Sequence, residues 1–325
     1  MNKAIKKQFA TGLCAFLITL LTSSYIHADI IIESKIDDGP WEKKKAIYPL
    51  KGQKVSLKVN APNGQSIRWY QILPDISKLY KNANFPWDDN PYKWIGYARI
   101  KYFRYELEQF RDQWEISPGF KKFTDPDYRH DTGSFWIQVE IYDGKKMMVS
   151  PGLKNNDHRG LSPDVFRISI RDGEGYIGYL TSFFNVPGLF GSVTYQSINY
   201  IGVDCADALM AAYSLWKNKP LKKNYNVTAV VNDFPVLYKL RLSAGTPSKK
   251  VYWGSGIKKG DFIAVKSYGN QYFHIGALIS DANRNGFLDG EDIVLHAGPA
   301  PLHYSSLKDG GFDGDVAIVR PCQSG

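Results

Sequence analysis

The chain has 325 residues, of which 43% are hydrophobic and 22% are charged, and its formal net charge is +9. This length is enough for two domains that each bury a hydrophobic core, and the proportions are those of a soluble globular protein. Beyond the N-terminus no apolar stretch is long enough to cross a membrane. No motif resembles those of nucleic-acid-binding proteins, so composition and motifs give no support to a nucleic-acid partner.

The first 28 residues have the pattern of a secretory signal peptide. Lys3, Lys6 and Lys7 precede an apolar run over about 10–21, and Ala28 offers a small residue for cleavage. An uncleaved anchor is the alternative, although the run is short for a membrane span. Cleavage removes these three lysines and no acid, which lowers the formal charge from +9 to +6. We therefore expect a secreted or periplasmic protein of the cell envelope.

Residues 29–172 have the pattern of a β domain. Apolar and polar residues alternate over four short stretches, as they do in strands with one buried face: 55–59, 67–71, 135–141 and 166–170. Asn63-Gly64 favours a tight turn between the first two stretches. We expect a β-sandwich of immunoglobulin-like form, although the chain lacks the Cys…Trp…Cys framework of true immunoglobulin domains.

An insert over about 74–132 interrupts these strands and is dense in aromatic residues. Its segment 102–114 is a candidate helix. Aromatic rings stack on sugars, so one interpretation of the insert is a glycan-binding face. The interpretation we favour is that the rings pack the insert against the sandwich.

Residues 173–325 are expected to form a second domain of helices and strands. After a junction rich in Gly and aromatic residues (173–200), the Ala-rich run Cys205–Tyr213 has apolar residues at helical spacing. The stretch 227–242 indicates a short strand and a helix. The pattern then predicts four strands: about 261–267, 272–279, 292–297 and 314–320.

Cys205 opens the predicted helix, and Asp204 is a suitable N-cap residue. A thiol in the first turn of a helix lies at the positive end of the macrodipole, which favours the nucleophilic thiolate. His274 and His296 lie in two of the predicted strands and supply candidates for the base that such a nucleophile needs. A lone histidine in a strand is more often structural, but a cysteine followed by two histidines favours a catalytic interpretation.

This order resembles the NlpC/P60 (papain-like) cysteine peptidases of bacterial cell walls. The family pattern is an Asp-Cys-Ser-Gly nucleophile motif, a Gly-Asp strand, a His-Val-Gly strand, and then a His, Asn or Gln. The corresponding residues are Asp204-Cys-Ala-Asp207, Gly260-Asp261, His274-Ile-Gly276 and His296. The resemblance covers about residues 190–321.

The resemblance implies a papain-like α+β domain that hydrolyses peptide or amide bonds. Cys205 would attack the carbonyl, His274 would take the thiol proton, and His296 would orient the ring of His274, with His303 as the runner-up for that role. The backbone N–H of Cys205 would stabilise the oxyanion. The family's typical substrate is the peptide stem of peptidoglycan, so a cell-envelope peptide is the expected partner. No cofactor takes part in this chemistry.

Four further residues are expected to contact the substrate. The resemblance assigns Asp204 to the amino group of the substrate peptide. Asp207 is a candidate to share that role, because Ala206 stands where the family has serine. The resemblance also places a tyrosine near the catalytic centre; Tyr195 and Tyr200 are candidates, and Tyr195 has the better spacing. Helix capping by Asp204 and ordinary packing of the tyrosines are the alternatives.

The segment Asp281-Ala-Asn-Arg-Asn-Gly-Phe-Leu-Asp-Gly-Glu-Asp292 fits the calcium-loop template at positions 1, 3, 5 and 6, with Asp instead of Glu at position 12. We expect a structural Ca²⁺ ion here, and a metal-free polar hairpin tip is the alternative. Because strands are predicted on both sides, the segment is not half of an EF-hand pair. The expected oxygen ligands come from Asp281, Asn283, Asn285, the Phe287 carbonyl, Asp289 and Asp292.

After signal cleavage two cysteines remain, and a disulfide between Cys205 and Cys322 is the alternative to a free nucleophile. Two rival functions stay open. One is a papain-like amidase, deamidase or transferase on a substrate outside the wall, which the change at Ala206 allows. The other is a non-enzymatic, calcium-stabilised binding protein.

Overall fold

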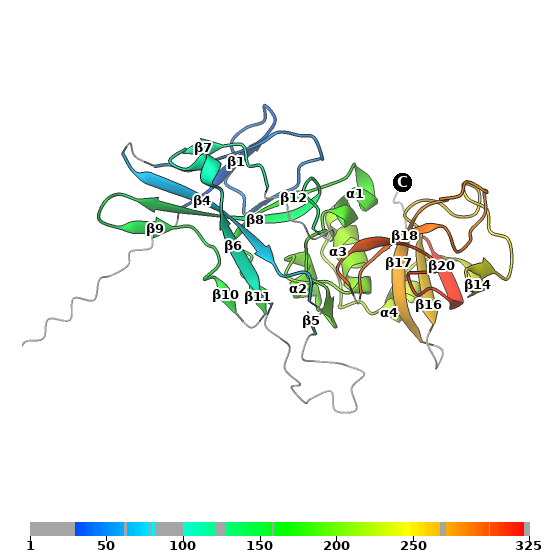
Figure 1. Cartoon of the computed structure of the whole chain (residues 1–325). Coiled ribbons are helices and arrows are strands. Elements are labelled where there is room, and N and C mark those ends of the chain that lie inside the picture. Colours follow the sequence, from blue (N-terminus) through cyan, green and yellow to red (C-terminus); the bar gives the residue numbers. More distant parts are fainter. Residues whose placement is uncertain are drawn as a thin grey trace, which may run out of the picture.

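The structure, a computed structural model, describes residues 30–61, 64–78, 80–81, 100–120, 128–157, 159–266, 271–298 and 300–321. The predicted signal peptide, Asn63 of the predicted turn, Cys322 and the insert residues 82–99 and 121–127 lie outside these ranges. The described part is α+β, as expected. Strands dominate the N-terminal half, and the C-terminal half combines helices with a curled sheet (Figure 1).

Two sheets form the N-terminal half. One has the order β1 (Glu33–Ile36), β3 (Val55–Lys58) and β7 (Glu115–Ile116). The other has the order β2 (Ala46–Ile47), β12 (Phe166–Ile170), β8 (Gly133–Tyr142), β4 (Ser66–Pro74) and β6 (Tyr102–Glu106), with β9 (Met147–Val149) beside β8. Leu57 of the first sheet and Trp69 and Ile137 of the second share one buried core. The two sheets therefore enclose an apolar layer, as the alternation in the sequence predicts.

The prediction of a helix over 102–114 is wrong. Tyr102–Glu106 is strand β6, which pairs antiparallel with β4, and Glu108–Phe110 forms a short 3-10 helix, η1. Aromatic residues fit a strand well when a neighbouring strand is available to pair with them. That neighbour, β4, is distant in sequence, so the local pattern did not show it.

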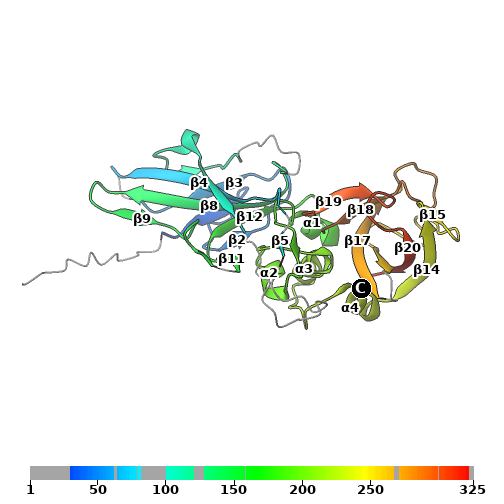
Figure 2. The same cartoon turned by 60° about the horizontal axis from the view of Figure 1, so that its bottom comes forward.

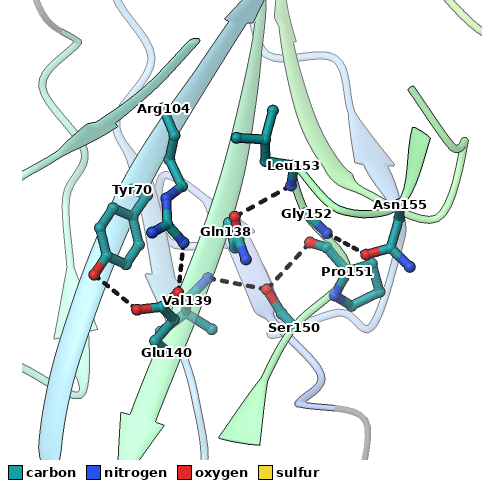
Figure 3. A network of polar contacts seen from close by, with 10 residues as sticks. All are labelled: Tyr70, Arg104, Gln138, Val139, Glu140, Ser150, Pro151, Gly152, Leu153 and Asn155. Carbon is teal, nitrogen blue, oxygen red and sulfur yellow. Dashed lines mark hydrogen bonds and ion pairs between the residues drawn. The ribbon is translucent and has the colours of Figure 1, made fainter. Parts of the chain in front are cut away.

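A polar network fixes β8 to its neighbours (Figure 3). The hydroxyl of Tyr70 donates to one oxygen of Glu140 at 2.8 Å, and Arg104 forms an ion pair with the other oxygen. On the far side of β8, the hydroxyl of Ser150 accepts from the backbone N–H of Val139 at 2.9 Å. Strands β4 and β6 and the segment after β9 are thus tied to one central strand.

Helices α1–α3 lie between the N-terminal sheets and the C-terminal sheet in both views (Figures 1 and 2). The helices are α1 (Gly175–Thr181), α2 (Thr194–Ile198), α3 (Cys205–Lys217) and α4 (Val227–Asp233). Two small ladders accompany them: β10 (Asn156–Asp157) with β11 (Gly160–Leu161), and β5 (Tyr80–Lys81) with β13 (Leu189–Phe190). None of the described helices is long and apolar enough to span a bilayer.

A seven-stranded antiparallel sheet forms most of the C-terminal half. Its order is β15 (Thr246–Pro247), β14 (Val236–Ser243), β20 (Gly314–Val319), β16 (Phe262–Lys266), β17 (Tyr272–Ser280), β18 (Ile293–His296) and β19 (His303–Ser306). The four predicted strands correspond to β16, β17, β18 and β20. The mixed stretch 227–242 forms α4 and then most of β14. Strand β19 was not predicted.

Alternate residues of this sheet face two separate cores. On β16, Phe262 and Ala264 pack with the helices, whereas Ile263 and Val265 face the inside of the curled sheet together with Phe312. Both faces are therefore buried, which explains why this strand is a continuous apolar run in the sequence. The face that carries Phe262 holds α3 against the sheet.

The ion pair between Arg320 and Asp261 joins the end of β20 to the start of β16. The guanidinium donates to both carboxylate oxygens, at 2.8 and 2.7 Å, and Asp261 is 1% exposed. Because Arg320→Met leaves this buried carboxylate without its charged partner, we expect the free energy of unfolding to fall by about 2–4 kcal/mol in chemical denaturation. Arg241→Met is the matched control, since its pair with Asp315 is exposed, and it should change stability by less than about 1 kcal/mol. Equal losses in both variants would contradict this ranking.

Candidate active site

Cys205 is the first residue of α3 and lies where the chain enters the layer between the sheets. Asp204 is the N-cap, as predicted, and its carboxylate accepts from the backbone N–H of Asp207 at 2.9 Å. The thiol is half-buried, and the structure gives Cys205 as a free cysteine. Cys322, its predicted alternative partner, lies outside the described residues.

The thiol contacts the backbone of β17 on both sides of His274. Its Sγ donates to the carbonyl of Phe273 at 3.9 Å and accepts from the backbone N–H of Ile275. The thiol therefore lies against β17 at the predicted base, but the His274 ring packs with Phe312 inside the curled sheet, whereas α3 packs on the other face. The resting thiol is hydrogen-bonded to the strand backbone rather than to the imidazole.

His274 and His296 lie on adjacent strands and bond to each other. The Nε2 of His274 is 2.9 Å from the Nδ1 of His296, and the ring of Phe312 packs against both imidazoles. His274 is 9% exposed and His296 is 3% exposed. Gly276 makes this approach possible, because a Cβ there would lie 2.9 Å from the Cβ of His296 and 2.5 Å from a methyl of Val294.

A hydroxyl that the sequence analysis missed completes this arrangement. The Oγ of Ser305, on β19, is 2.8 Å from the Nε2 of His296 and donates its own proton to the carbonyl of Ser306 at 3.0 Å. With its single proton on the Ser306 carbonyl, Ser305 accepts from the Nε2 of His296. A recognised strand over 303–306 would have indicated this residue, since Ser305 then shares a face with His303.

The position of each proton in this chain follows from Ser305. If the Nε2 of His296 donates to Ser305, the Nδ1 of neutral His296 must accept, and the Nε2 of His274 must donate to it. The Nδ1 of His274 is then left without a proton. That nitrogen is the one able to act as a base.

Burial keeps both imidazoles neutral. Desolvation, with a smaller contribution from His303, lowers the pKa of His274 to about 4. Desolvation and the neighbouring histidines lower the pKa of His296 to about 2. The imidazole of His274 is therefore neutral above about pH 4. The runner-up, His303, packs 4.3 Å from the ring of His296, and its Nδ1 donates to the carbonyl of Pro301 at 2.8 Å.

The surroundings of the Cys205 thiol disfavour the thiolate, in contrast to the expectation from its place in the first turn of a helix. Burial raises the pKa of Cys205 above its ordinary value, and the charge of Asp204 raises this pKa further, while the N–H of Ile275 opposes both. Burial also raises the pKa of Asp204 to about 6. These effects oppose the helix macrodipole, whose influence is limited to the first turn.

Asp207 lies inside the protein and not on a substrate-facing surface. It is 1% exposed, and its carboxylate accepts from the hydroxyl of Ser192. The same hydroxyl accepts from the backbone N–H of Asp204 at 3.0 Å. Asp204 and Asp207 therefore belong to one internal network around the start of α3. Burial raises the pKa of Asp207, and the charge of Asp204 adds to this effect.

The two tyrosine candidates have different surroundings. Tyr200 is 1% exposed, stacks on Phe183 with ring centroids 4.1 Å apart, and its hydroxyl lies 2.7 Å from that of Ser182. Its place is in the core and not at a substrate surface. Tyr195, on α2, is 41% exposed. The guanidinium carbon of Arg159 lies over its ring, 5.2 Å from the ring centroid. Tyr195 is therefore the candidate with a ring accessible to a ligand.

The predicted calcium loop, Asp281–Asp292, connects β17 to β18. Asp281 accepts from the N–H of Gly286 at 2.7 Å, and Asn285 accepts from the N–H of Phe287 at 2.7 Å. The side-chain amides of Asn283 and Asn285 both donate to Asp289. Asp292 is fully buried, and desolvation raises its pKa to about 6.

Carboxylates alone do not make a metal site in this loop. Within the described ranges, no three His, Cys, Asp or Glu side chains are grouped closely enough to hold a metal ion. A cation between Asp281 and Asp292 would therefore depend on the asparagine and backbone carbonyl oxygens as well.

Comparison with known proteins gives no relative: no family model, no curated protein and no solved structure matches the chain. The geometry of the site must therefore carry the functional argument.

The hydrogen-bond chain predicts the tautomers of two histidines. In long-range ¹H–¹⁵N spectra near neutral pH, we expect both His274 and His296 to carry their proton on Nε2, because each Nε2 faces an acceptor. Ser305→Ala removes the final acceptor and should change the signals of both rings. Ser306→Ala is the matched control, since that hydroxyl bonds to Asp309 instead. Unchanged spectra in Ser305→Ala would show that Ser305 does not set the tautomers.

The charge of Asp204 gives a second prediction about the thiol. Asp204→Asn keeps an oxygen that can cap α3 but removes the charge that raises the pKa of Cys205. The alkylation rate by iodoacetamide at about pH 8 should therefore rise about three- to tenfold. Cys205→Ala gives the background, and Asp233→Asn, at the exposed end of α4, is the substitution control. A slower or unchanged rate would show that the charge of Asp204 does not control the thiol.

Proposed function

We propose that the protein is a cysteine hydrolase that cleaves a peptide or amide bond, with Cys205 as the nucleophile and His274 as the base. The observation that carries the proposal is the contact of the Cys205 thiol with the backbone on both sides of His274, whose Nε2 is bonded to His296. Cysteine, base and orienting residue come from α3, β17 and β18. They follow the logic of a catalytic triad.

The proton positions support His274 as the base. The chain Ser305–His296–His274 leaves the Nδ1 of His274 free to accept the thiol proton. In the resting structure the thiol donates to the carbonyl of Phe273 and not to the imidazole, so proton transfer to His274 would require the two groups to approach each other. A thiol with a raised pKa is expected to lose its proton as it attacks, and not beforehand.

The sulfur of Cys205 bonds to the substrate carbonyl carbon while the thiol proton moves to His274. The carbon–nitrogen bond of the substrate then breaks, and His274 returns the proton to the leaving amine. Water, deprotonated by His274, hydrolyses the thioester and restores the thiol.

The start of α3 offers a donor for the oxyanion. The backbone N–H of Cys205 belongs to the first turn, where amides lack partners within the helix. Gly298, after β18, faces this amide: a Cβ at Gly298 would lie 3.9 Å from the nitrogen of Cys205.

We propose a papain-like arrangement for residues 173–325 and an immunoglobulin-like sandwich for residues 29–172. The proposed substrate is the peptide stem of peptidoglycan, and the proposed location is outside the cytoplasm. The signal-peptide pattern of residues 1–28 and the basic charge of the chain support a place in an anionic cell envelope. The N-terminal half would then position the substrate or attach the protein to the wall.

A second candidate is a papain-like amidase, deamidase or transferase on a substrate outside the wall. It is favoured by the surroundings of Asp204 and Asp207, whose carboxylates are engaged by backbone amides and by Ser192. These acids are therefore poorly placed to bind the amino group of a stem peptide, and Ala206 has no hydroxyl to do so.

Digestion of purified peptidoglycan, read by mass spectrometry, tests the proposal. We expect new peptide fragments with the wild-type protein and none with Cys205→Ala, because the sulfur forms the thioester. Ser305→Thr keeps a hydroxyl and should retain activity, whereas Ser305→Ala should reduce kcat about 10–100-fold with little change in KM.

The alternatives give different results in the same experiment. Alkylation of Cys205 without cleavage of any wall type would favour the second candidate. Fragments that persist in Cys205→Ala would overturn the role of the cysteine. Cys205 that resists alkylation and is found joined to Cys322 would overturn the hydrolase altogether.

A further inference from the structure

We propose that the loop Asp281–Asp292 binds a calcium ion whose ligands include the buried carboxylate of Asp292. This inference does not depend on the proposed hydrolase, since it concerns a loop that holds none of the proposed catalytic residues. It rests on an unsatisfied oxygen, on the pairing of the loop with a neighbouring segment, and on the chemistry of its side chains.

Asp292 has an oxygen with no partner. The residue is fully buried, and its Oδ1 makes no hydrogen bond in the structure. Its Oδ2 accepts from the N–H of Asp289 at 3.1 Å and from the indole of Trp253 at 2.8 Å, so the carboxylate faces the loop that it closes. A buried carboxylate oxygen without a donor is costly, and a cation is the partner that removes this cost.

The backbone leaves a second oxygen available at the position that the calcium-loop template requires. The N–H of Trp253 donates to the carbonyl of Gly286, and the N–H of Leu288 donates to the carbonyl of Val251. This pairing on either side leaves the carbonyl of Phe287 without a backbone donor among the described residues. Gly286, with φ +80°, makes the sharp bend that turns the chain at this point.

The remaining candidate ligands surround one carboxylate. Asp289 accepts from the side-chain amides of both Asn283 and Asn285, two residues at ligand positions of the template. A cation would take the place of these two N–H donors, and each asparagine would then present its oxygen after rotation of the amide. Asp281, at the first ligand position, is held toward the loop by its bonds to Asn285 and Gly286.

The donor set identifies the class of cation. All candidate ligand atoms are oxygens, and two are neutral amides, which suits a hard cation with a large and flexible coordination shell. The segment has four acids and one arginine, Arg284, so it attracts a divalent cation. Asp at position 12 is shorter than the usual Glu, and we expect a dissociation constant of about 10⁻⁴–10⁻³ M, the range of extracellular calcium modules.

Calcium here would act on the hairpin that carries both site histidines. The loop joins the end of β17 to the start of β18, and Ser280 pairs with Ile293 directly beyond it. His274 and His296 lie on these two strands. A bound ion would therefore restrict how far the strands can separate at the loop end.

Titration of the purified protein with CaCl₂, followed by calorimetry and by Tm, tests the site. We expect one saturable site and a rise in Tm. Tb³⁺ gives an independent signal, because Trp253 lies within hydrogen-bond distance of a ligand and should sensitise Tb³⁺ emission that Ca²⁺ displaces.

Three variants decide where the ion binds. Asp292→Asn keeps an acceptor for Trp253 but removes the charge, and should weaken Ca²⁺ binding at least about tenfold. Asp281→Asn should do the same and decides the matter if Asp292→Asn fails to fold. Glu291→Gln is the matched control, since Glu291 pairs with Lys308 instead, and its affinity should be unchanged. Absence of saturable binding up to about 10 mM Ca²⁺, or equal binding by all variants, would overturn the proposal.

Discussion

The antiparallel pairing of β17 with β16 on one side and β18 on the other is the constraint on which the site depends. It sets His274 opposite Val265 and places His296 near Gly276 on the adjoining strand. A slip of one residue in this register would turn both imidazoles to the opposite face of the sheet. Gly276 lets the strands carry two large rings at this point, because any side chain there would meet the Cβ of His296.

Burial of two neighbouring histidines, His274 and His296, creates a demand for hydrogen-bond partners that also determines which ring nitrogens carry protons. An imidazole nitrogen left without a partner in such a core costs about 1–3 kcal/mol. The structure meets this demand for His296 at both nitrogens, through His274 and Ser305. Since every member of the chain has one proton to donate, satisfying the polar groups also fixes which nitrogen of His274 is free. The same hydrogen bonds would therefore serve both stability and the proposed role of His274 as a base.

The start of α3 shows a competition between capping and thiol acidity. An N-cap carboxylate contributes about 1 kcal/mol to helix stability. The same negative charge raises the pKa of the adjacent thiol, and burial raises it more. The macrodipole acts in the opposite direction by only about 0.3–1 kcal/mol at exposed sites. The capped helix start therefore gains stability while its cysteine loses acidity, so the proposed attack by this thiol would require a nearby base.

The sequence predicted the parts of this structure that depend on local periodicity. The strands β4, β8, β16, β17, β18 and β20 and the helix that begins at Cys205 follow from alternating or helical spacing. Strand β6 could not be predicted, because its identity depends on pairing with β4, which lies far away in the sequence. Ser305 was missed for the same reason. Strand β19 has the sequence His-Tyr-Ser-Ser, without an apolar alternation, and the role of the Ser305 hydroxyl is apparent only from its contact with His296.

Tyr200 explains why the N-terminal sheets matter to the site and are not simply an attached module. It has a positive φ of 60°, which is uncommon for a residue with a large side chain, and it lies on the segment that leads to Cys205. Arg167, from β12, stacks on its ring at 3.8 Å and donates to the carbonyl of Asn199 at 3.1 Å. A backbone in this region persists only where its surroundings over-determine it. The N-terminal sheets supply these contacts, so the direction in which the chain enters α3, and with it the position of the thiol, is set by residues of both halves.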